Sequence, residues 1–179
     1  MEAGLRCFAE LGYSRARLTD IVAEAGVTTG ALYGHFDSKA DFFDALFALY
    51  GDALSAALDE SSSLVDAIAQ YLEVSREYRG VVRASAEILQ ARSDHAAARR
   101  RLREVCAGVL AWHLREPLTQ REARIVARVL VDVLDQYTHM EAAEWLKPRR
   151  PHDVAEALRG WSHAACTPRE VTKRGQTWP

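Results

Sequence analysis

Apolar residues recur along this chain at the spacing of α-helices, and no segment shows the alternation typical of β-strands. The clearest example is the stripe formed by Leu18, Ile21, Val22 and Ala25, at positions i, i+3, i+4 and i+7 of a helix with 3.6 residues per turn. Gly26 predicts the end of this helix, because glycine adopts the left-handed backbone that closes a helix. The pattern therefore predicts an all-α protein.

A second short helix is predicted directly after Gly26, with the hydroxyl of Thr28 or Thr29 capping its first N–H groups. Leu32 and Phe36 share its inward face at i and i+4. The opposite face carries short or amphipathic residues, namely Thr29, Gly30, Tyr33, Gly34 and His35. Two short helices around a tight turn are typical of a helix-turn-helix DNA reader, which needs small side chains and a few hydrogen-bond donors in the major groove. An ordinary helical hairpin inside a bundle has the same spacing.

Downstream residues predict a larger helical region. Ser38, with Asp41 three residues later, predicts the start of a long helix that leaves the reader, and Thr119 with Glu122 forms a capping box. Serines near residue 61, Gly80 and several prolines divide the remaining apolar pattern. The other predicted helices cover residues 64–78, 81–91, 93–115, 120–143 and 153–165.

Charge and composition narrow the classes of function. The 179-residue chain has a net charge of −2, and residues 1–50 carry four basic against seven acidic side chains, so charge alone does not indicate DNA binding. Arg15, Arg17, His35 and Lys39 nevertheless surround the predicted reader, and association depends on local potential. There is no long apolar run and no leader that resembles a signal peptide, which predicts a cytoplasmic protein with no membrane partner.

The sequence has no motif that predicts enzymatic chemistry. It contains no GxSxG, Walker or GxGxxG motif, and no HxxxH or CxxC pair, so we expect no enzyme activity, no metal and no cofactor. The three cysteines, Cys7, Cys106 and Cys166, are expected to be reduced and buried. The basic run between Arg99 and Arg103 is interpreted as a solvated helix face rather than a second nucleic-acid site.

The order of residues from Leu5 to Phe43 resembles the DNA-binding domain of TetR-family transcriptional regulators. That domain has an apolar helix ending in Phe-x-x-x-Gly-Tyr, followed by Ile-Ala-x-x-Ala-Gly-Val-Ser-x-Gly-x-Leu-Tyr-x-His-Phe-x-Ser-Lys. The matching positions are Phe8, Gly12, Tyr13, Ile21, Ala25, Gly26, Val27, Gly30, Leu32, Tyr33, His35, Phe36, Ser38 and Lys39. So many matches at fixed spacing favour the reader over the plain hairpin.

The sequence departs from the family pattern in three places. Ala16 and Arg17 stand where threonine commonly begins the second helix, so a phosphate contact from Arg17 is expected in its place. Thr28 stands where serine is usual and keeps the hydroxyl. Met1 lies only four positions before Leu5, which fits a trimmed sequence or a protein without a basic arm.

The resemblance implies a three-helix DNA-binding domain at residues 1–45, a helical ligand-binding and dimerisation domain at 46–166, and an irregular tail at 167–179. It implies a sequence-specific repressor that binds a pseudo-palindromic double-stranded DNA operator and is released by a small hydrophobic effector. The alternative is a helical small-molecule-binding or interaction protein that has lost DNA binding. The expected DNA-binding residues are Arg17, Thr28, Thr29, Gly30, Tyr33, Gly34, His35 and Lys39, the last on a phosphate.

The last two predicted helices are the reason to expect a homodimer. Residues 125–134 are apolar around most of the helix, so two faces need to be covered, and Val154, Leu158 and Trp161 form a narrow seam of coiled-coil type. The expected interface residues are Val129, Val133, Val154, Leu158 and Trp161. Packing of both helices within one chain remains the alternative.

The middle helices are expected to enclose a ligand pocket, as the resemblance implies. The expected lining is Trp112, His113, Tyr137 and Met140, with Tyr71 and Tyr78 as further candidates. Either His113 or Asp135 would orient a polar group of the ligand. The aromatic residues predict a largely hydrophobic, aromatic small molecule.

Overall fold

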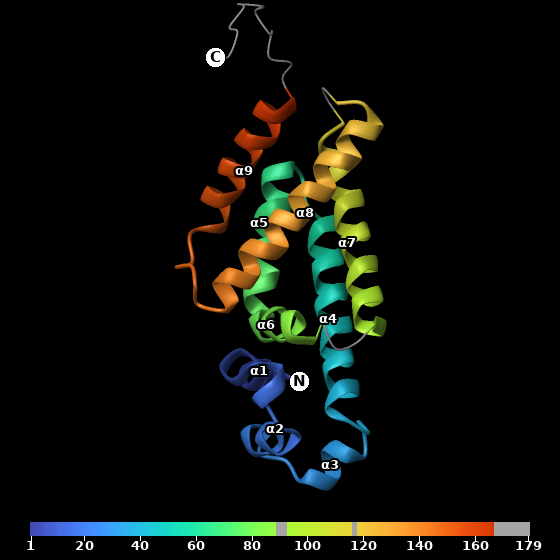
Figure 1. The fold of residues 1–179 in the computed structure, drawn as a ribbon, viewed down its shortest axis with the longest axis vertical. Helices are drawn as coiled ribbons and strands as arrows, with labels where there is room; N and C mark the ends of the chain where they lie inside the picture. Colours follow the sequence, from blue (N-terminus) through green and yellow to red (C-terminus); the bar gives the residue numbers. More distant parts are fainter. Residues whose placement is uncertain (89–92, 116–117, 167–179) are drawn as a thin grey trace, which may run out of the picture.

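The computed structural model describes residues 1–88, 93–115 and 118–166, and these form nine helices and no strand (Figure 1). The helices are α1 (Glu2–Arg15), α2 (Leu18–Ala25), α3 (Thr29–Tyr33), α4 (Lys39–Asp59), α5 (Leu64–Glu77), α6 (Arg79–Ile88), α7 (Ser93–His113), α8 (Gln120–Ala142) and α9 (Pro151–Cys166). The all-α prediction is confirmed. The predicted tail at residues 167–179 lies outside the described residues.

The first three helices and the first turns of α4 form a small unit at one end of the molecule (Figure 1), which we call the reading domain. Its core is a cluster of aromatic rings. Phe8 is fully buried and packs edge-on against Phe43, with ring centroids 5.6 Å apart, and Tyr13 stacks on Phe8 at 5.9 Å. Helix α1 bends at Gly12, whose φ of 71° favours glycine. This bend lies next to Tyr13 and helps to set the position of its ring.

Helix α4 runs from the reading domain into the rest of the molecule, which we call the body (Figure 1). Its start is capped as predicted, because the Ser38 hydroxyl accepts a hydrogen bond from the Asp41 amide at 3.1 Å. Phe43 lies in the core near its beginning and Leu58 near its end. The predicted capping box before α8 is also confirmed, with Thr119 and Glu122 bonded to each other.

Helix α6 crosses α1 at very short range and joins the body to the reading domain (Figure 1). A Cβ atom at Gly80 would lie 2.1 Å from the carbonyl oxygen of Leu5. Gly80 therefore lies inside α6 to permit this approach, whereas the sequence had predicted that it precedes the helix. Further along α6, Arg83 donates to the Ala9 carbonyl at 2.5 Å and Glu87 accepts from the Ser14 amide at 2.7 Å.

Helix α9 packs against α5, and α7 lies beside α8. Val154 and Leu158 are half-buried against the core of their own chain, which supports the alternative of packing within one chain; their part in a subunit interface stays a prediction. The seam of α9 is covered by α5 because both helices are amphipathic. Helix α9 also begins at Pro151, two residues earlier than predicted, because proline is tolerated in the first turn of a helix.

Two of the cysteine predictions can be checked. Cys7 and Cys106 are free and buried, as expected, and the Cys166 side chain lies outside the described part of the chain. None of the described helices combines the length and the apolar composition needed to cross a bilayer. The described residues also contain no group of three or more His, Cys, Asp or Glu side chains arranged to hold a metal ion.

Candidate nucleic-acid interface and effector cavity

The turn between α2 and α3 is set by two residues. Gly26 has φ 65° and ψ 25°, the left-handed conformation that ends α2. Thr28 then caps α3, since its Oγ1 accepts a hydrogen bond from the Ala31 amide at 3.2 Å. Of the two threonines proposed as the cap, the structure uses Thr28. Its hydroxyl proton stays available for a second acceptor.

Helix α3 leaves most of its surface open. None of its five residues is buried, Thr29 and Gly30 are exposed, and Tyr33 is 51% exposed. Leu32 and Phe36 face inward as predicted, and Phe36 packs edge-on against Phe42 at 5.0 Å. The reading domain thus presents a short helix anchored on one side by an aromatic contact.

The helix is shorter than the sequence suggested. It ends at Tyr33, so Gly34 and His35 belong to the turn that follows, where the His35 amide donates to the Leu32 carbonyl at 3.0 Å. Both residues are exposed. They therefore continue the open surface of α3 without being part of the helix.

Arg17 is the residue directly before α2, the position where the family pattern commonly has threonine. Its backbone amide donates to Asp20 Oδ2 at 2.8 Å, so a carboxylate three residues later replaces part of the missing cap. The Arg17 side chain is exposed. It is therefore free to reach toward a phosphate.

The structure corrects the expectation for Lys39. Its ammonium group donates to the carbonyl oxygens of Tyr13 at 2.7 Å and Ala16 at 2.9 Å, and it lies 4.3 Å from the centre of the Tyr13 ring. Partial burial lowers the pKa of Lys39. Two of its three N–H groups are used inside the protein, so Lys39 ties the end of α1 to the start of α4 instead of projecting toward DNA.

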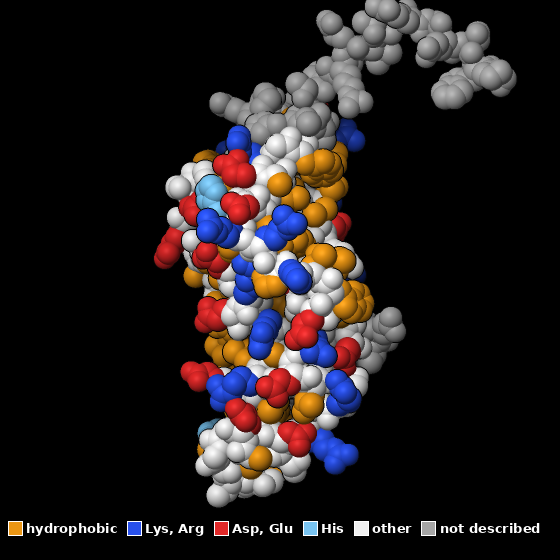
Figure 2. Space-filling model, turned by 90° about the vertical axis from the view of Figure 1, so that its left-hand side faces the viewer, with side chains coloured by type: hydrophobic (Ala, Val, Ile, Leu, Met, Phe, Trp, Pro, Cys, Tyr) orange, Lys and Arg blue, Asp and Glu red, His pale blue; other side chains and the backbone are white. Residues whose placement is uncertain are grey.

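The surface around α3 carries little charge. In the view of Figure 2, the lower end of the molecule, where α3 lies, shows almost no Lys, Arg, Asp or Glu side chains. With Lys39 turned inward, the cations that remain nearby are Arg15 and Arg17, both exposed. Any affinity for DNA must therefore come from few phosphate contacts per subunit.

The body encloses a small cavity among α4, α5, α6, α7 and α8. Its volume is about 30 Å³, enough for water but not for a larger molecule. Its lining includes apolar side chains such as Phe47 and Leu102 as well as the charged side chains of Arg99, Arg103 and Asp135. This mixed lining differs from the largely hydrophobic pocket expected from the sequence.

Asp135 is the centre of the polar part of the lining. Its carboxylate accepts from the Tyr71 hydroxyl at 2.5 Å and from Arg99 Nη2 at 3.1 Å, and it forms an ion pair with Arg103 Nε at 3.1 Å. Burial, together with the negative charge of Asp135, raises the pKa of the nearby Cys106 thiol to about 12. Cys106 is therefore a neutral lining group and no nucleophile.

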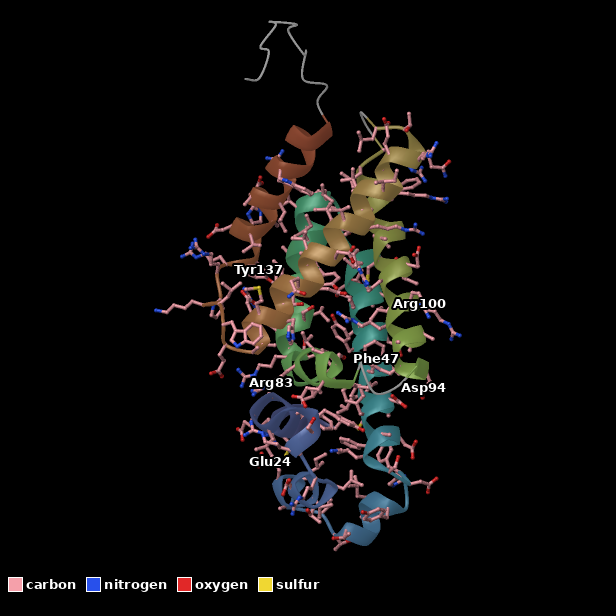
Figure 3. All side chains as sticks on the ribbon, viewed as in Figure 1. Glu24, Phe47, Arg83, Asp94, Arg100 and Tyr137 are labelled. Carbon is pink, nitrogen blue, oxygen red and sulfur yellow. The ribbon has the colours of Figure 1, made fainter. Side chains whose placement is uncertain are left out.

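Two cavity residues correspond to sequence candidates, Tyr71 and Asp135. The four principal candidates do not line the cavity. Trp112 is 60% exposed beneath the Arg115 guanidinium, and His113 lies at α7's end with Nε2 3.1 Å from Ser61 Oγ. Tyr137 (labelled in Figure 3) and Met140 are half-buried on other faces of α8.

Sequence reasoning missed the two arginines of the cavity. The basic run was interpreted as solvated, but only Arg100 and Arg101 are exposed, whereas Arg99 and Arg103 turn inward to Asp135. Positions i and i+4 share a helix face, so the spacing of Arg99 and Arg103 was an available signal.

Comparison with known proteins identifies the class of this fold and interface. Residues 1–46 match the family described as "Bacterial regulatory proteins, tetR family". The reading domain is therefore similar in sequence to the DNA-binding domain of this family, whereas the body is compared with known proteins by its fold.

Individual relatives show how the similarity is distributed. The HTH-type transcriptional regulator TtgR of Pseudomonas putida is 48% identical over 46 residues, which are 26% of this chain and 22% of that protein. The HTH-type transcriptional repressor KstR2 of Rhodococcus jostii is 37% identical over 65 residues, 32% of each chain. The chain thus matches only about a fifth to a third of these curated relatives.

Solved structures extend the similarity to the whole fold. A transcriptional regulator from Aquifex aeolicus aligns with a TM-score of 0.72 at 19% identity, covering 92% of this chain and 95% of that chain. PfmR, a TetR-family regulator from Thermus thermophilus, aligns with a TM-score of 0.66 at 20% identity, covering 90% and 94%. At these identities the alignments establish the architecture of the body and not its ligand.

Proposed function

We propose that this chain is a homodimeric transcriptional repressor that binds a DNA operator through α3 and releases it when a small molecule occupies the cavity of the body. The observation that carries this proposal is the open face of α3, a helix with no buried residue, held at one end of the molecule on a rigid aromatic core. A buried face would have left no surface for a duplex. The match of residues 1–46 to the tetR family supports the same function.

In this proposal, contacts to bases come from α3 and the turn around it. Thr29 and Tyr33 supply hydroxyl groups to base edges or phosphates, and Gly30 and Gly34 allow the backbone to approach closely. Thr28 and His35 flank this surface, and Arg17 contacts a phosphate. Lys39 is left out of the contact set and acts as a positioning residue.

A dimer would place two α3 helices on a pseudo-palindromic operator. Val129 and Val133 of α8 and Trp161 of α9 remain 40%, 37% and 46% exposed, and Ile125 extends the α8 stripe at 56%. Figure 2 shows hydrophobic side chains gathered on the upper body. Such exposed apolar side chains support an interface between two copies of the chain.

Helix α6 lies between the cavity and α1, and this position explains how a bound ligand would release the DNA. Val82, Ser85 and Ala86 line the cavity, while Arg83 and Glu87 of the same helix hold α1. A ligand larger than water must separate the helices around the cavity, so it favours a conformation in which α6 and α1 have shifted. The ligand then weakens DNA binding to the extent that it binds this shifted conformation more tightly than the conformation that binds DNA.

The DNA-binding proposal is tested with a duplex selected from a random-sequence library on the full chain. We expect Tyr33→Ala to weaken binding to the selected duplex by at least about tenfold, within the range of a lost specific contact. Arg17→Ala should weaken binding to all sequences and reduce the slope of log affinity against log salt by about one. Leu49→Ala, at an exposed apolar residue of α4, is the matched control and should leave binding unchanged.

A second function is favoured by the low charge around α3 and the inward position of Lys39. The chain would then be a helical small-molecule-binding or interaction protein that no longer reads DNA. Selection that enriches no duplex even at low salt would support this second function and reject the first.

A further inference from the structure

We propose that the ligand of the body cavity is a compact organic acid whose carboxylate is held by Arg99 and Arg103 of α7. This inference rests on the ligand-responsive function proposed above and specifies the chemistry of its effector. It adds a negatively charged group to the largely hydrophobic, aromatic small molecule expected from the sequence.

The wall of the cavity holds two guanidinium groups and one carboxylate. Arg99 and Arg103 contribute two positive charges, and Asp135 contributes the only carboxylate among the described residues of the lining. The second carboxylate near Arg103 belongs to Asp132, whose side chain is 60% exposed and lies outside the cavity. Arg103 pairs with both Asp132 and Asp135, whereas Arg99 pairs with Asp135 alone, so Arg99 is the guanidinium group with more capacity for a further anion.

The arginines also have hydrogen-bonding capacity to spare. A guanidinium group has five N–H donors, and Arg99 gives Asp135 one hydrogen bond, from Nη2. Arginine pairs with carboxylates through two parallel hydrogen bonds, which a neutral amide or alcohol cannot accept as strongly. The two side chains lie one helical turn apart, and Asp135 shows that one carboxylate can contact both; a ligand carboxylate would bind their remaining N–H groups.

Two further polar atoms face the cavity without a partner among the described residues. They are Oγ of Ser85, a residue only 6% exposed, and Nδ1 of His139. Buried polar atoms are nearly always hydrogen-bonded, so such atoms indicate a polar molecule in the cavity. Ser85 lies on α6, the helix that also contacts α1.

The remaining wall favours an organic acid over inorganic phosphate. Phe47, Val82 and Leu102 add apolar side chains to the same lining. A molecule with one anionic end and a short apolar end matches both kinds of side chain. Its small size follows from the cavity volume of about 30 Å³, which requires the helices to move even for a compact ligand.

A groove on the surface beside α8 shares lining residues with the cavity. A surface groove of about 390 Å³, lined in part by Arg83 and Trp145, shares Ala86 and His139 with the cavity. His139 lines both spaces, and its ring packs edge-on against Trp145, with centroids 5.9 Å apart. A ligand that displaces His139 passes directly beside the α6 residues that hold α1.

The test measures binding to the full chain by calorimetry at constant ionic strength. The probes are benzoate, phenylacetate and hexanoate, each compared with its amide, and inorganic phosphate. We expect saturable binding of at least one acid, with its amide and phosphate at least tenfold weaker. Arg99→Gln should weaken that acid at least tenfold, whereas Arg100→Gln, one residue further along α7 and pointing away from the body in Figure 3, should leave it unchanged.

Ser85→Ala is a second variant that tests the inference if Arg99→Gln does not fold. It removes one hydroxyl and no charge, and it should weaken the acid severalfold while circular dichroism and the unfolding temperature stay as in the wild type. The inference is overturned if no acid binds, if the amide or phosphate binds as tightly, or if the acid binds Arg99→Gln as it binds the wild type.

Binding to the DNA duplex selected from the random-sequence library distinguishes failure of this inference from failure of the proposed function. Specific DNA binding without binding of any acid overturns the inference and leaves the DNA-reading proposal standing. Acid binding that is lost in Arg99→Gln, by a chain that binds no duplex, supports the inference and overturns the repressor.

Discussion

The reading domain packs aromatic rings at its centre, whereas the body places charged and hydroxyl side chains around a cavity. Phe8 and Phe43 are fully buried in the first, and Arg99 and Asp135 are bonded to each other inside the second. Sequence similarity follows the same division. The reading domain is 48% identical to a curated regulator over 46 residues, while structures that cover the whole fold share only 19–20%.

This difference has a physical explanation. A close-packed apolar core accepts few changes of volume, so the fold of a DNA reader restricts the residues that build it. A cavity that recognises a ligand depends on the chemistry of that ligand, which varies while the helices around it keep their arrangement. The body can therefore retain the fold and still carry the unusual pair of inward arginines.

The largest effect should come from the aromatic core of the reading domain. Phe8→Ala removes a fully buried ring from contact with Phe43 and Tyr13, and we expect it to lower the free energy of unfolding by about 3–5 kcal/mol. Urea unfolding at one fixed protein concentration measures this change, because dimerisation makes stability concentration-dependent. A loss below about 1 kcal/mol would contradict a tightly packed reading domain.

The polar core of the body should be less sensitive. Asp135→Ala leaves Arg99 and Arg103 without their shared carboxylate, but their side chains are 27% and 37% exposed, so we expect a loss of about 1–3 kcal/mol. Asp132→Ala, at a position 60% exposed, is the control and should change stability by less than about 0.5 kcal/mol. Equal effects of the two substitutions would show that the cavity charges are solvated.

The contact between the two regions can be tested at one glycine. Gly80→Ala would push α6 away from the Leu5 carbonyl, and we expect it to cost about 1–3 kcal/mol of unfolding free energy. Gly108→Ala, in α7 with no atom within 4 Å of the added carbon, should instead stabilise the protein by about 0.5–1 kcal/mol. Stabilisation by both substitutions would contradict the close approach of α6 to α1.

The smallest effect should be a change in pH dependence. Burial and the positive charge of Arg99 lower the pKa of His139. The unfolded chain therefore binds this proton more readily, so stability falls as the pH drops below about 6.5, until His139 titrates in the folded protein. In His139→Gln this fall should be smaller.

The slope of unfolding free energy against pH is measured by urea unfolding between about pH 7.5 and about pH 5.5, because histidine side chains titrate in this range. His152→Gln, at an exposed position of α9, is the matched control. A slope that changes equally in both variants would place His139 in a solvated environment.

Much of the reading domain was predictable because its signals are local. Gly26 ends α2, Thr28 caps α3 and Ser38 caps α4 as the sequence indicated. A cap or a turn depends on residues three or four positions apart, so the sequence contains all the information it needs. The same reasoning predicted the capping box at the start of α8.

The ligand-binding candidates failed because lining a cavity is not a local property. Trp112 has the size and chemistry of a pocket residue, yet it lies on the open face of α7. Lys39 has the charge of a phosphate contact, yet the end of α1 supplies two carbonyl acceptors for it. In both cases a neighbouring helix, distant in sequence, decides what the side chain can reach.

The sequence by itself determined the helices, their caps, the family of the reading domain and the exposed face of α3, because periodicity and capping act within a few turns of the chain. Only the tertiary structure decided that Arg99 and Arg103 face Asp135, that Gly80 brings α6 against α1, and that Val154 and Leu158 pack on α5. Each of these depends on the relative rotation and separation of helices, which are fixed by packing among residues far apart in the sequence.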